Sequence, residues 1–220
     1  GLDFFVNKNV LIPRPDTEIL VEEVIKTINN EQLTINKLTL IDIGAGSGCI
    51  PISILKNTKE IKTFAIDISK PALMVAQKNA KKHKVKIKFL HGNFLNPILK
   101  LKNNFENIII TANLPYLTEE QYQSEKSIQH EPKSALVAKK NGLALYEELL
   151  NQVKQLANLV PSPYNLVPII YLEIDPSQSE KITILINKIL PNTKIEIKKD
   201  LAGRDRVAKI SQFAKKNNFC

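Results

Sequence analysis

The sequence predicts an α/β fold in which a mostly parallel, seven-stranded sheet is covered by helices on both faces. Short apolar runs, several of them β-branched, alternate along the 220 residues with longer segments whose apolar residues have helical spacing. Such alternation favours parallel strands, because each helix carries the chain back to the edge where the next strand begins. In sheets of this kind ligands bind beyond the carboxyl ends of the strands, so residues that directly follow strands are the candidate site.

The expected elements follow one another in a single domain that spans residues 1–220. Residues 1–35 form a lead-in segment and a helix, and residues 36–220 form the core. The seven expected strands are 38–43, 62–66, 86–90, 107–112, 169–174, 194–197 and 206–213. The expected core helices are 49–55, 69–83, 143–159 and 177–190, with Ser69 as an N-cap and Pro71 in the first turn. Residues 117–132 are polar and predict a long functional loop with one helix, and Pro161, Pro163 and Pro168 bracket another loop.

Composition excludes several classes of protein. Hydrophobic residues make up 43% and charged residues 24% of the chain, which is typical of a globular domain. No apolar run approaches the ~20 residues of a membrane-spanning helix, so we expect no membrane partner. Cys49 and Cys220 are far apart and have no metal-ligand spacing, which indicates a reducing compartment and a cytoplasmic protein. We expect a monomer.

The formal net charge of +9 is compatible with nucleic acid as a partner. However, nearly all the basic residues are lysines spread along many segments, and Arg14, Arg204 and Arg206 are the only arginines. Dispersed lysine is typical of a solvated surface. Charge alone therefore predicts no more than incidental RNA affinity.

A glycine-rich segment follows the first strand. Residues 42–48 read Asp-Ile-Gly-Ala-Gly-Ser-Gly and lead directly into a helix, whose free N–H groups favour a polar ligand. A dinucleotide fingerprint needs a glycine at the sixth position from Gly44, which is Cys49, and a P-loop needs a Gly-Lys-Ser/Thr ending. Glycines at the first, third and fifth positions instead match the methyltransferase form of this loop. The predicted cofactor contacts here are Gly44, Ala45, Gly46, Ser47 and Gly48.

Residues after the second and third strands complete the predicted cofactor site. Asp67 ends the second strand, where an acid can accept hydrogen bonds from both ribose hydroxyls. Its structural alternative is an acid at a helix N-terminus beside Ser69. Asn93 and Phe94 follow the third strand and would contact adenine, through hydrogen bonds to the ring edge and through stacking. The alternative for Phe94 is a core side chain.

The chemical site is predicted at Asn113, Leu114, Pro115 and Tyr116, directly after the fourth strand. A planar NH2 group is a poor nucleophile because its lone pair is delocalised. Two acceptors, the Asn113 side-chain oxygen and the Leu114 carbonyl, can hold its two N–H groups and direct electron density to nitrogen. Pro115 would fix the backbone, and the Tyr116 ring would pack on the planar group. Positioning then provides most of the rate; the alternative is a plain turn after a strand.

Other chemistry finds no support in the sequence. His83, His91 and His130 form neither a metal-binding helix motif nor a triad, and no metal site is expected.

Taken together, these motifs resemble the bacterial release factor glutamine methyltransferases, the HemK or PrmC family, over nearly the whole chain. The segments at the two ends of the chain, with Ile-Pro-Arg-Pro-x-Thr-Glu and Ala-Gly-x-x-Arg, are much more specific than the glycine loop. The segments that carry the resemblance are 4–6, 10–18, 42–48, 113–116, 131–136, 141–143, 172–174 and 200–207. Leu114 stands where the family usually has proline, and Asn93 where it usually has aspartate.

The resemblance implies a class I S-adenosylmethionine-dependent methyltransferase with a Rossmann-like fold. It implies transfer of a methyl group from S-adenosyl-L-methionine, which leaves S-adenosyl-L-homocysteine, to N5 of the glutamine in the Gly-Gly-Gln loop of peptide chain release factors, a protein methylation in translation termination. Asn113 would contact both substrate and cofactor. The family also has a small N-terminal helical domain, which we expect to be absent from this chain.

Two alternatives stay open at this stage. Asn-Leu-Pro-Tyr is the form of the motif in the ribosomal RNA adenine dimethyltransferases, so N6-adenine methylation of RNA or DNA is one alternative. Against it stand the two end segments and the scarcity of arginine, which is the usual residue for bidentate phosphate and base contacts. The other alternative is a methyltransferase fold that serves only as a binding module, although the glycine loop is intact.

Overall fold

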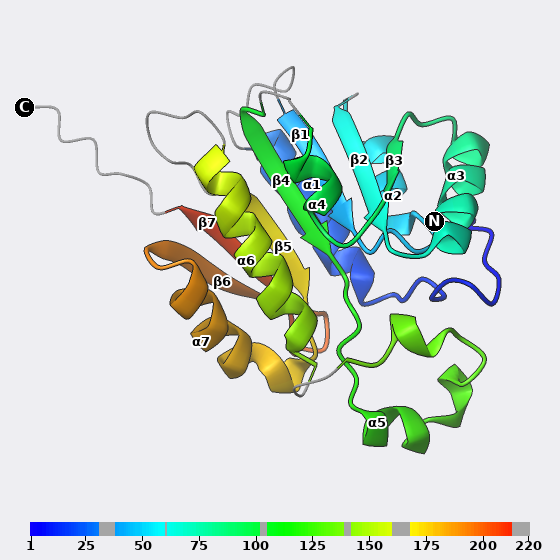
Figure 1. Cartoon of the computed structure of the whole chain (residues 1–220). Helices are drawn as coiled ribbons and strands as arrows, with labels where there is room; N and C mark the ends of the chain where they lie inside the picture. The colour runs from blue at the N-terminus through cyan, green and yellow to red at the C-terminus, as the bar shows by residue number, and fades with distance from the viewer. Residues whose placement is uncertain (31–37, 60, 102–104, 139–141, 160–167, 213–220) are drawn as a thin grey trace, which may run out of the picture.

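The sheet determines where the candidate residues meet. The computed structural model describes residues 1–30, 38–59, 61–101, 105–138, 142–159 and 168–212. Within them, seven strands form one sheet in the order β3-β2-β1-β4-β5-β7-β6 (Figure 1). The strands are β1 (Leu38–Ile43), β2 (Lys62–Asp67), β3 (Lys88–His91), β4 (Asn107–Ala112), β5 (Ile169–Glu173), β6 (Thr193–Lys199) and β7 (Asp205–Gln212). β7 runs in the opposite direction to the other six strands, so the predicted mostly parallel α/β fold is confirmed.

The central strands are apolar because both faces of the sheet are covered. Every residue of β1 is buried, and β4 is buried from Ile108 onward. β1 pairs in parallel with β2 on one side and with β4 on the other. Consequently the residues that follow these three strands emerge at one edge of the sheet.

Helices cover the two faces of the sheet as predicted (Figure 1). One face carries α1 (Thr17–Asn30), α2 (Cys49–Asn57) and α3 (Lys70–His83), and the other carries α4 (Asn96–Leu99), α6 (Ala144–Leu159) and α7 (Ser179–Ile189). Leu20, Val24 and Ile28 recur every fourth residue and form the buried stripe of α1. Each face has its own hydrophobic cluster, so the sheet is held between two apolar layers.

A lobe of residues 117–138 lies between β4 and α6, beside the carboxyl edge of the sheet (Figure 1). It contains α5 (Glu119–Ser124) and two short 3-10 turns, Lys126–Ile128 and Lys133–Ala135. The N–H of Leu117 donates to the Leu136 carbonyl at 2.9 Å, and the N–H of Ala138 donates to the Leu117 carbonyl at 3.0 Å. These bonds close the lobe at its base, where the predicted long loop with one helix proves to have defined structure.

The boundaries of most elements agree with the sequence predictions to within two residues. β3 begins at Lys88 rather than at 86, and α7 begins at Ser179 rather than at 177, because a 3-10 turn, Pro176–Gln178, precedes it. The Ser69 hydroxyl caps α3 by accepting from the Ala72 N–H at 3.2 Å, as predicted. Several predicted features fall outside the described residues: the loop prolines Pro161 and Pro163, Asn141, the strand end at Phe213, and Cys220. Among the helices of the described ranges, none is long and apolar enough to span a membrane.

Candidate active site

The predicted site residues gather at the carboxyl edge of the sheet, the lower edge in Figure 1. The glycine loop follows β1, Asp67 ends β2, Asn93 and Phe94 follow β3, and Asn113 follows β4. The adjacent pairing of these strands brings segments that are separate in sequence to neighbouring positions. This is the site that the topology predicts.

The glycine loop turns sharply between β1 and α2. Gly44, Gly46 and Gly48 all have positive φ, at 74°, 52° and 78°. The N–H groups of Gly44 and Ala45 both donate to the Ile66 carbonyl of β2, at 2.9 and 3.0 Å. Gly44 is exposed, and a Cβ there would lie 3.3 Å from Leu114 Cδ2 and 3.7 Å from the Asn113 carbonyl oxygen. The glycine loop is therefore in contact with the chemical motif.

Asp67 fastens the glycine loop to the second strand. Its Oδ2 accepts from the Gly46 N–H at 2.9 Å, and its Oδ1 accepts from the Ser69 N–H at 2.8 Å. Burial raises the pKa of the Asp67 carboxyl, and the N–H groups of Gly46 and Ser69 oppose the shift. A carboxylate has about four acceptor sites, so the three backbone donors Gly46, Ser69 and Ile68 leave one for a ligand hydroxyl. Asp67 therefore has the structural role of one interpretation of the sequence and a free acceptor for the other.

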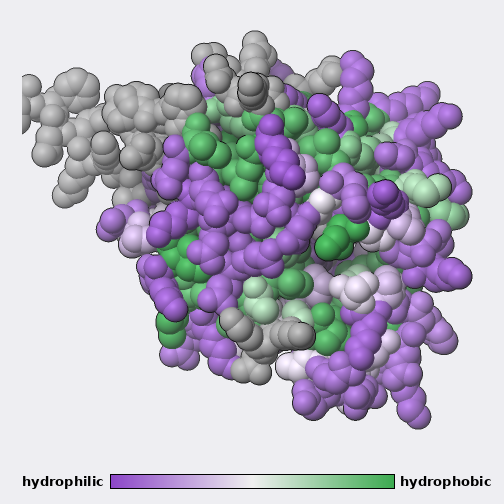
Figure 2. All heavy atoms as spheres, in the orientation of Figure 1, coloured by the Kyte–Doolittle hydropathy of each residue, from purple (hydrophilic) through white to green (hydrophobic). Residues whose placement is uncertain are grey.

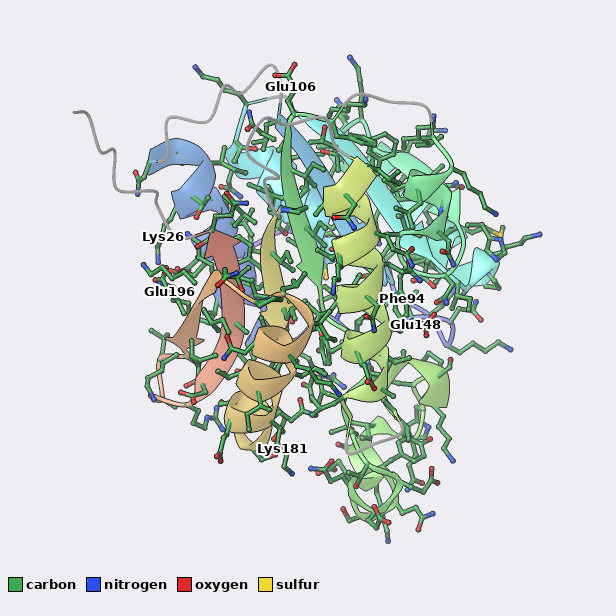
Figure 3. All side chains as sticks on the ribbon, turned by 60° about the vertical axis from the view of Figure 1, so that its left-hand side comes forward. Lys26, Phe94, Glu106, Glu148, Lys181 and Glu196 are labelled. Carbon is green, nitrogen blue, oxygen red and sulfur yellow. The ribbon has the colours of Figure 1, made fainter. Side chains whose placement is uncertain are left out.

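Asn93 and Phe94 lie where β3 leads toward α4. Asn93 Nδ2 donates to Glu148 Oε1 of α6 at 2.5 Å, which leaves its side-chain oxygen as an acceptor. Phe94 has a positive φ of 44° and is 9% exposed, within the hydrophobic cluster on the α6 face. Figure 3 shows Phe94 and Glu148 close together beside α6. A left-handed φ at a bulky residue is strained, and such strain is typical of functional sites.

Asn113 is held by residues that are distant in sequence. Its Nδ2 donates to the hydroxyl of Thr17, the first residue of α1, at 3.2 Å. Its side chain also acts as a donor that opposes the raised pKa of Glu173, the last residue of β5. Both partners are buried, with exposures of 6% for Thr17 and 1% for Glu173. The Asn113 side chain is therefore held in place by buried groups on the side away from the pocket.

A pocket of about 350 Å³ opens in front of this motif. Its wall contains all four predicted motif residues, and the lobe and the lead-in segment supply the rest. Figure 2 shows hydrophobic residues above the lobe, as well as at the top and left of the same face. The lining residues are Leu11, Arg14, Asn113, Leu114, Pro115, Tyr116, Leu117, Gln121, Ser124, Glu125, Ile128, Ala135 and Leu136.

The two tyrosines near the motif are neutral at physiological pH. Burial raises the pKa of Tyr116 to about 12, so its ring acts as a packing surface rather than as a base. Burial also raises the pKa of Tyr146 well above its usual value. The Tyr146 hydroxyl makes a short hydrogen bond to the Glu173 carbonyl and lies 3.4 Å from the Leu114 carbonyl oxygen. At that distance it leaves Leu114 free to accept another donor.

Arg14 and Glu131 join the lead-in segment to the lobe, a contact that no local pattern in the sequence indicated. Their side chains form a short ion pair, and Glu131 Oε2 accepts from the Ile12 N–H at 2.8 Å. The Glu131 side chain is 5% exposed, and Arg14 lines the pocket. Both residues lie in motifs that carried the family resemblance, which was the only signal in the sequence.

The sequence analysis assigned no individual role to two buried carboxyls, those of Asp42 and Glu173. Burial raises the pKa of Asp42, in β1, to about 7, and a hydrogen bond from the Thr111 hydroxyl at 2.6 Å opposes the shift. Burial likewise raises the pKa of Glu173 to about 7. One oxygen of each carboxyl has no hydrogen-bond partner. Buried carboxyls are rare in apolar strands, and that rarity was the signal available in the sequence.

The described residues offer no other catalytic arrangement. Within them, no group of three or more His, Cys, Asp or Glu side chains could hold a metal ion. Burial raises the pKa of the Cys49 thiol to about 11, which disfavours the nucleophilic thiolate. His83 and His91 each bond through Nε2 to a backbone carbonyl, of Asp3 at 2.9 Å and of Ile68 at 3.0 Å, which is a structural role.

The chain is similar in sequence to one described protein family and to several characterised proteins. Residues 15–142 match the family described as the methyltransferase small domain. The release factor glutamine methyltransferase of Enterococcus faecalis is 36% identical over 210 residues, which cover 94% of this chain and 70% of that protein. The enzyme of the same name from Flavobacterium psychrophilum is 37% identical over 214 residues, which cover 96% and 71%. Neither alternative from the sequence is favoured by these relatives.

Among solved structures, the N-terminal domain of human METTL16 in complex with SAH is similar, with a TM-score of 0.63. The match has 16% identity and covers 97% of this chain and 77% of that chain. At this identity the likeness shows the fold, which is that of the class I methyltransferases.

Proposed function

Because the chain belongs to the release factor glutamine methyltransferase family, we propose that it transfers a methyl group from S-adenosyl-L-methionine to N5 of the glutamine in the Gly-Gly-Gln loop of peptide chain release factors. The observation that carries the proposal is a pocket lined by Asn113, Leu114, Pro115 and Tyr116 beside the glycine loop. In it the Asn113 side-chain oxygen and the Leu114 carbonyl would be the two acceptors. This arrangement suits a planar NH2 group, and a glutamine side chain ends in one.

The residues at the carboxyl edge fit the cofactor. The exposed backbone of Gly44 leaves room that a side chain would fill. Asp67 would accept from a ribose hydroxyl, while Asn93 and Phe94 would contact adenine. When bound, the cofactor supplies an electrophilic methyl group. We assign Gly44, Ala45, Gly46, Ser47, Gly48, Asp67, Asn93, Phe94 and Asn113 to its binding.

The acceptors in the pocket orient the substrate amide. The Asn113 side-chain oxygen and the Leu114 carbonyl each accept one of its N–H groups and so turn the nitrogen lone pair toward the cofactor. Pro115 restricts the backbone that carries the Leu114 carbonyl. The neutral Tyr116 ring packs on the amide plane. The catalytic role of these residues is to hold the amide in a reactive geometry, and such positioning can supply about 7–11 kcal/mol of a reaction barrier.

The test of this proposal compares a protein substrate and an RNA substrate in one experiment. Purified protein is incubated with radiolabelled S-adenosyl-L-methionine and either a bacterial release factor or total RNA. We expect label on the release factor only, and no label on a release factor whose Gly-Gly-Gln glutamine is replaced by alanine. Label on RNA alone would refute the proposal in favour of adenine methylation. Failure to bind the cofactor in calorimetry would refute both activities and leave a binding module.

Asp67→Ala should separate cofactor binding from folding. Loss of a charged acceptor for a ribose hydroxyl costs about 1.5–3 kcal/mol, so we expect the dissociation constant for the cofactor to rise about 10- to 100-fold. Calorimetry measures the constant, and thermal unfolding measures stability. The matched control is Ser69→Ala, which removes only the cap of α3 and should lower stability by about 1 kcal/mol without weakening binding. Equal losses of affinity and stability in Asp67→Ala would make Asp67 purely structural.

The remaining properties of the protein follow from this role. We infer a cytoplasmic enzyme, because its substrate is a translation factor, and a monomer that meets the release factor through the pocket and the lobe. The formal charge of +9 gives incidental affinity for RNA.

A further inference from the structure

The orientation of the Asn113 amide follows from the donors and acceptors behind it. The NH2 group of the amide can only donate, and its oxygen can only accept. Nδ2 donates to the Thr17 hydroxyl at 3.2 Å and also bonds to the Glu173 side chain. An ionised carboxylate can only accept, so it cannot pair with the amide oxygen.

Thr17 makes this arrangement directional. The Thr17 side chain also hydrogen-bonds to Glu173. A hydroxyl has a single hydrogen, and the Glu173 carboxylate requires it as a donor. Thr17 therefore accepts from Asn113 and donates to Glu173. If the Asn113 amide were rotated by 180°, its oxygen would face the Thr17 hydroxyl oxygen and the Glu173 carboxylate, which are both acceptors. Both hydrogen bonds would then be lost.

We propose that Thr17 and Glu173 are positioning residues for methyl transfer, which keep the side-chain oxygen of Asn113 turned toward the substrate pocket. Neither residue lines the pocket, whereas Asn113 does, so we place their effect on the substrate through Asn113. The inference rests on the proposed function, since it concerns the acceptor that holds the substrate amide. It adds two residues from α1 and β5 to a motif that was predicted as four consecutive residues.

The proposal implies a defined dependence on pH. Burial raises the pKa of Glu173 to about 7, so its carboxylate forms in the folded protein only as the pH rises through that value. A protonated Glu173 is a donor, competes for the Asn113 oxygen and releases the amide from its fixed orientation. The turnover number should therefore rise with pH through about 7. The titratable groups that act on Glu173 from the surrounding elements are Asp16, Arg206, Tyr116, Tyr146 and Cys49.

The experiment compares four variants with the wild-type protein in the release factor assay. Glu173→Gln and Thr17→Val should each lower kcat about tenfold, the effect of one lost hydrogen bond to a charged network, with KM for the release factor within about twofold. Thr17→Ser keeps the hydroxyl and should retain at least about half of kcat. Thr63→Val removes a comparably buried hydroxyl in β2 and should leave kcat unchanged.

Two further readouts distinguish positioning from folding. The rise of kcat through a pH of about 7 should disappear in Glu173→Gln. The side-chain NH2 resonances of Asn113, assigned by their absence in Asn113→Ala, should shift over the same range in the wild-type protein and not in Glu173→Gln. This second measurement needs no substrate, so it decides the inference even if the release factor proves not to be a substrate.

Three outcomes would overturn the inference. One is unchanged kcat in both Glu173→Gln and Thr17→Val. Another is a pH response of the Asn113 resonances that persists without the Glu173 carboxyl. The third is a loss of activity that only matches a loss of folded protein in thermal unfolding.

Discussion

Replacing Asn113 by alanine should lower the rate of methyl transfer to a release factor by about 10²–10³-fold. This is the loss seen when one group aimed at a reacting centre is removed from a pre-organised site. Alanine removes the acceptor for one N–H of the substrate amide and leaves Thr17 and Glu173 without their partner. The folded protein should survive, because Asn113 lies at the partly exposed end of a strand whose apolar residues remain buried.

The measurement is the initial rate with radiolabelled cofactor, accompanied by calorimetry of cofactor binding. Asn107→Ala is the matched control, since Asn107 begins the same strand at the opposite edge of the sheet. It should retain wild-type activity. If Asn113→Ala keeps more than about a third of the wild-type rate while it binds the cofactor normally, Asn113 is not a catalytic residue.

Gly142→Ala should displace the backbone of the motif at Tyr116, although Gly142 is not part of that motif. Gly142 has a φ of 79°, and a Cβ there would lie 2.1 Å from the Tyr116 carbonyl oxygen and 2.3 Å from Gln178 Nε2. Two atoms cannot approach that closely, so the backbone at Tyr116 must move. We expect a loss of about 3 kcal/mol or more of unfolding free energy and, in the fraction that still folds, a loss of methyl transfer.

Gly203→Ala is the control for Gly142→Ala. Gly203 has nearly the same φ, 78°, but nothing lies within 4 Å of a Cβ placed there. The strain of a left-handed backbone alone costs roughly 1–2 kcal/mol, which is the loss of stability expected for Gly203→Ala. The free energies of unfolding of both variants, measured with denaturant, separate the cost of backbone strain from the cost of the steric clash at Tyr116. Equal destabilisation would show that the approach of Gly142 to Tyr116 has no importance of its own.

Local patterns account for the parts of this molecule that the sequence predicted well. Short apolar runs such as Leu38–Ile43 are typical of buried strands, and glycines directly after such a run mark a sharp turn. The sequence therefore predicted the sheet, the glycine loop, and the motif from Asn113 to Tyr116, since each depends on neighbouring residues. Whether these residues bind cofactor and substrate remains a prediction.

Local sequence patterns could not predict contacts between residues that are far apart in the chain. The bond from Asn113 to Thr17 spans 96 residues, and the pair of Arg14 with Glu131 spans 117. Asn93 was predicted as an adenine contact, and the bond from its NH2 group to Glu148 was not foreseen. These contacts depend on how α1, the lobe and α6 pack on the sheet, and a single sequence carries no record of that packing.

The strand order has a consequence for the nascent protein. A chain that has emerged from the ribosome as far as β4 contains the glycine loop, Asp67 and Asn113, but it lacks Glu173, which arrives with β5. The far edge of β5 is covered only by β7, the last strand to be synthesised. If Glu173 is a positioning residue, a chain that ends before β5 holds the Asn113 amide through Thr17 alone, even where its cofactor loop has folded.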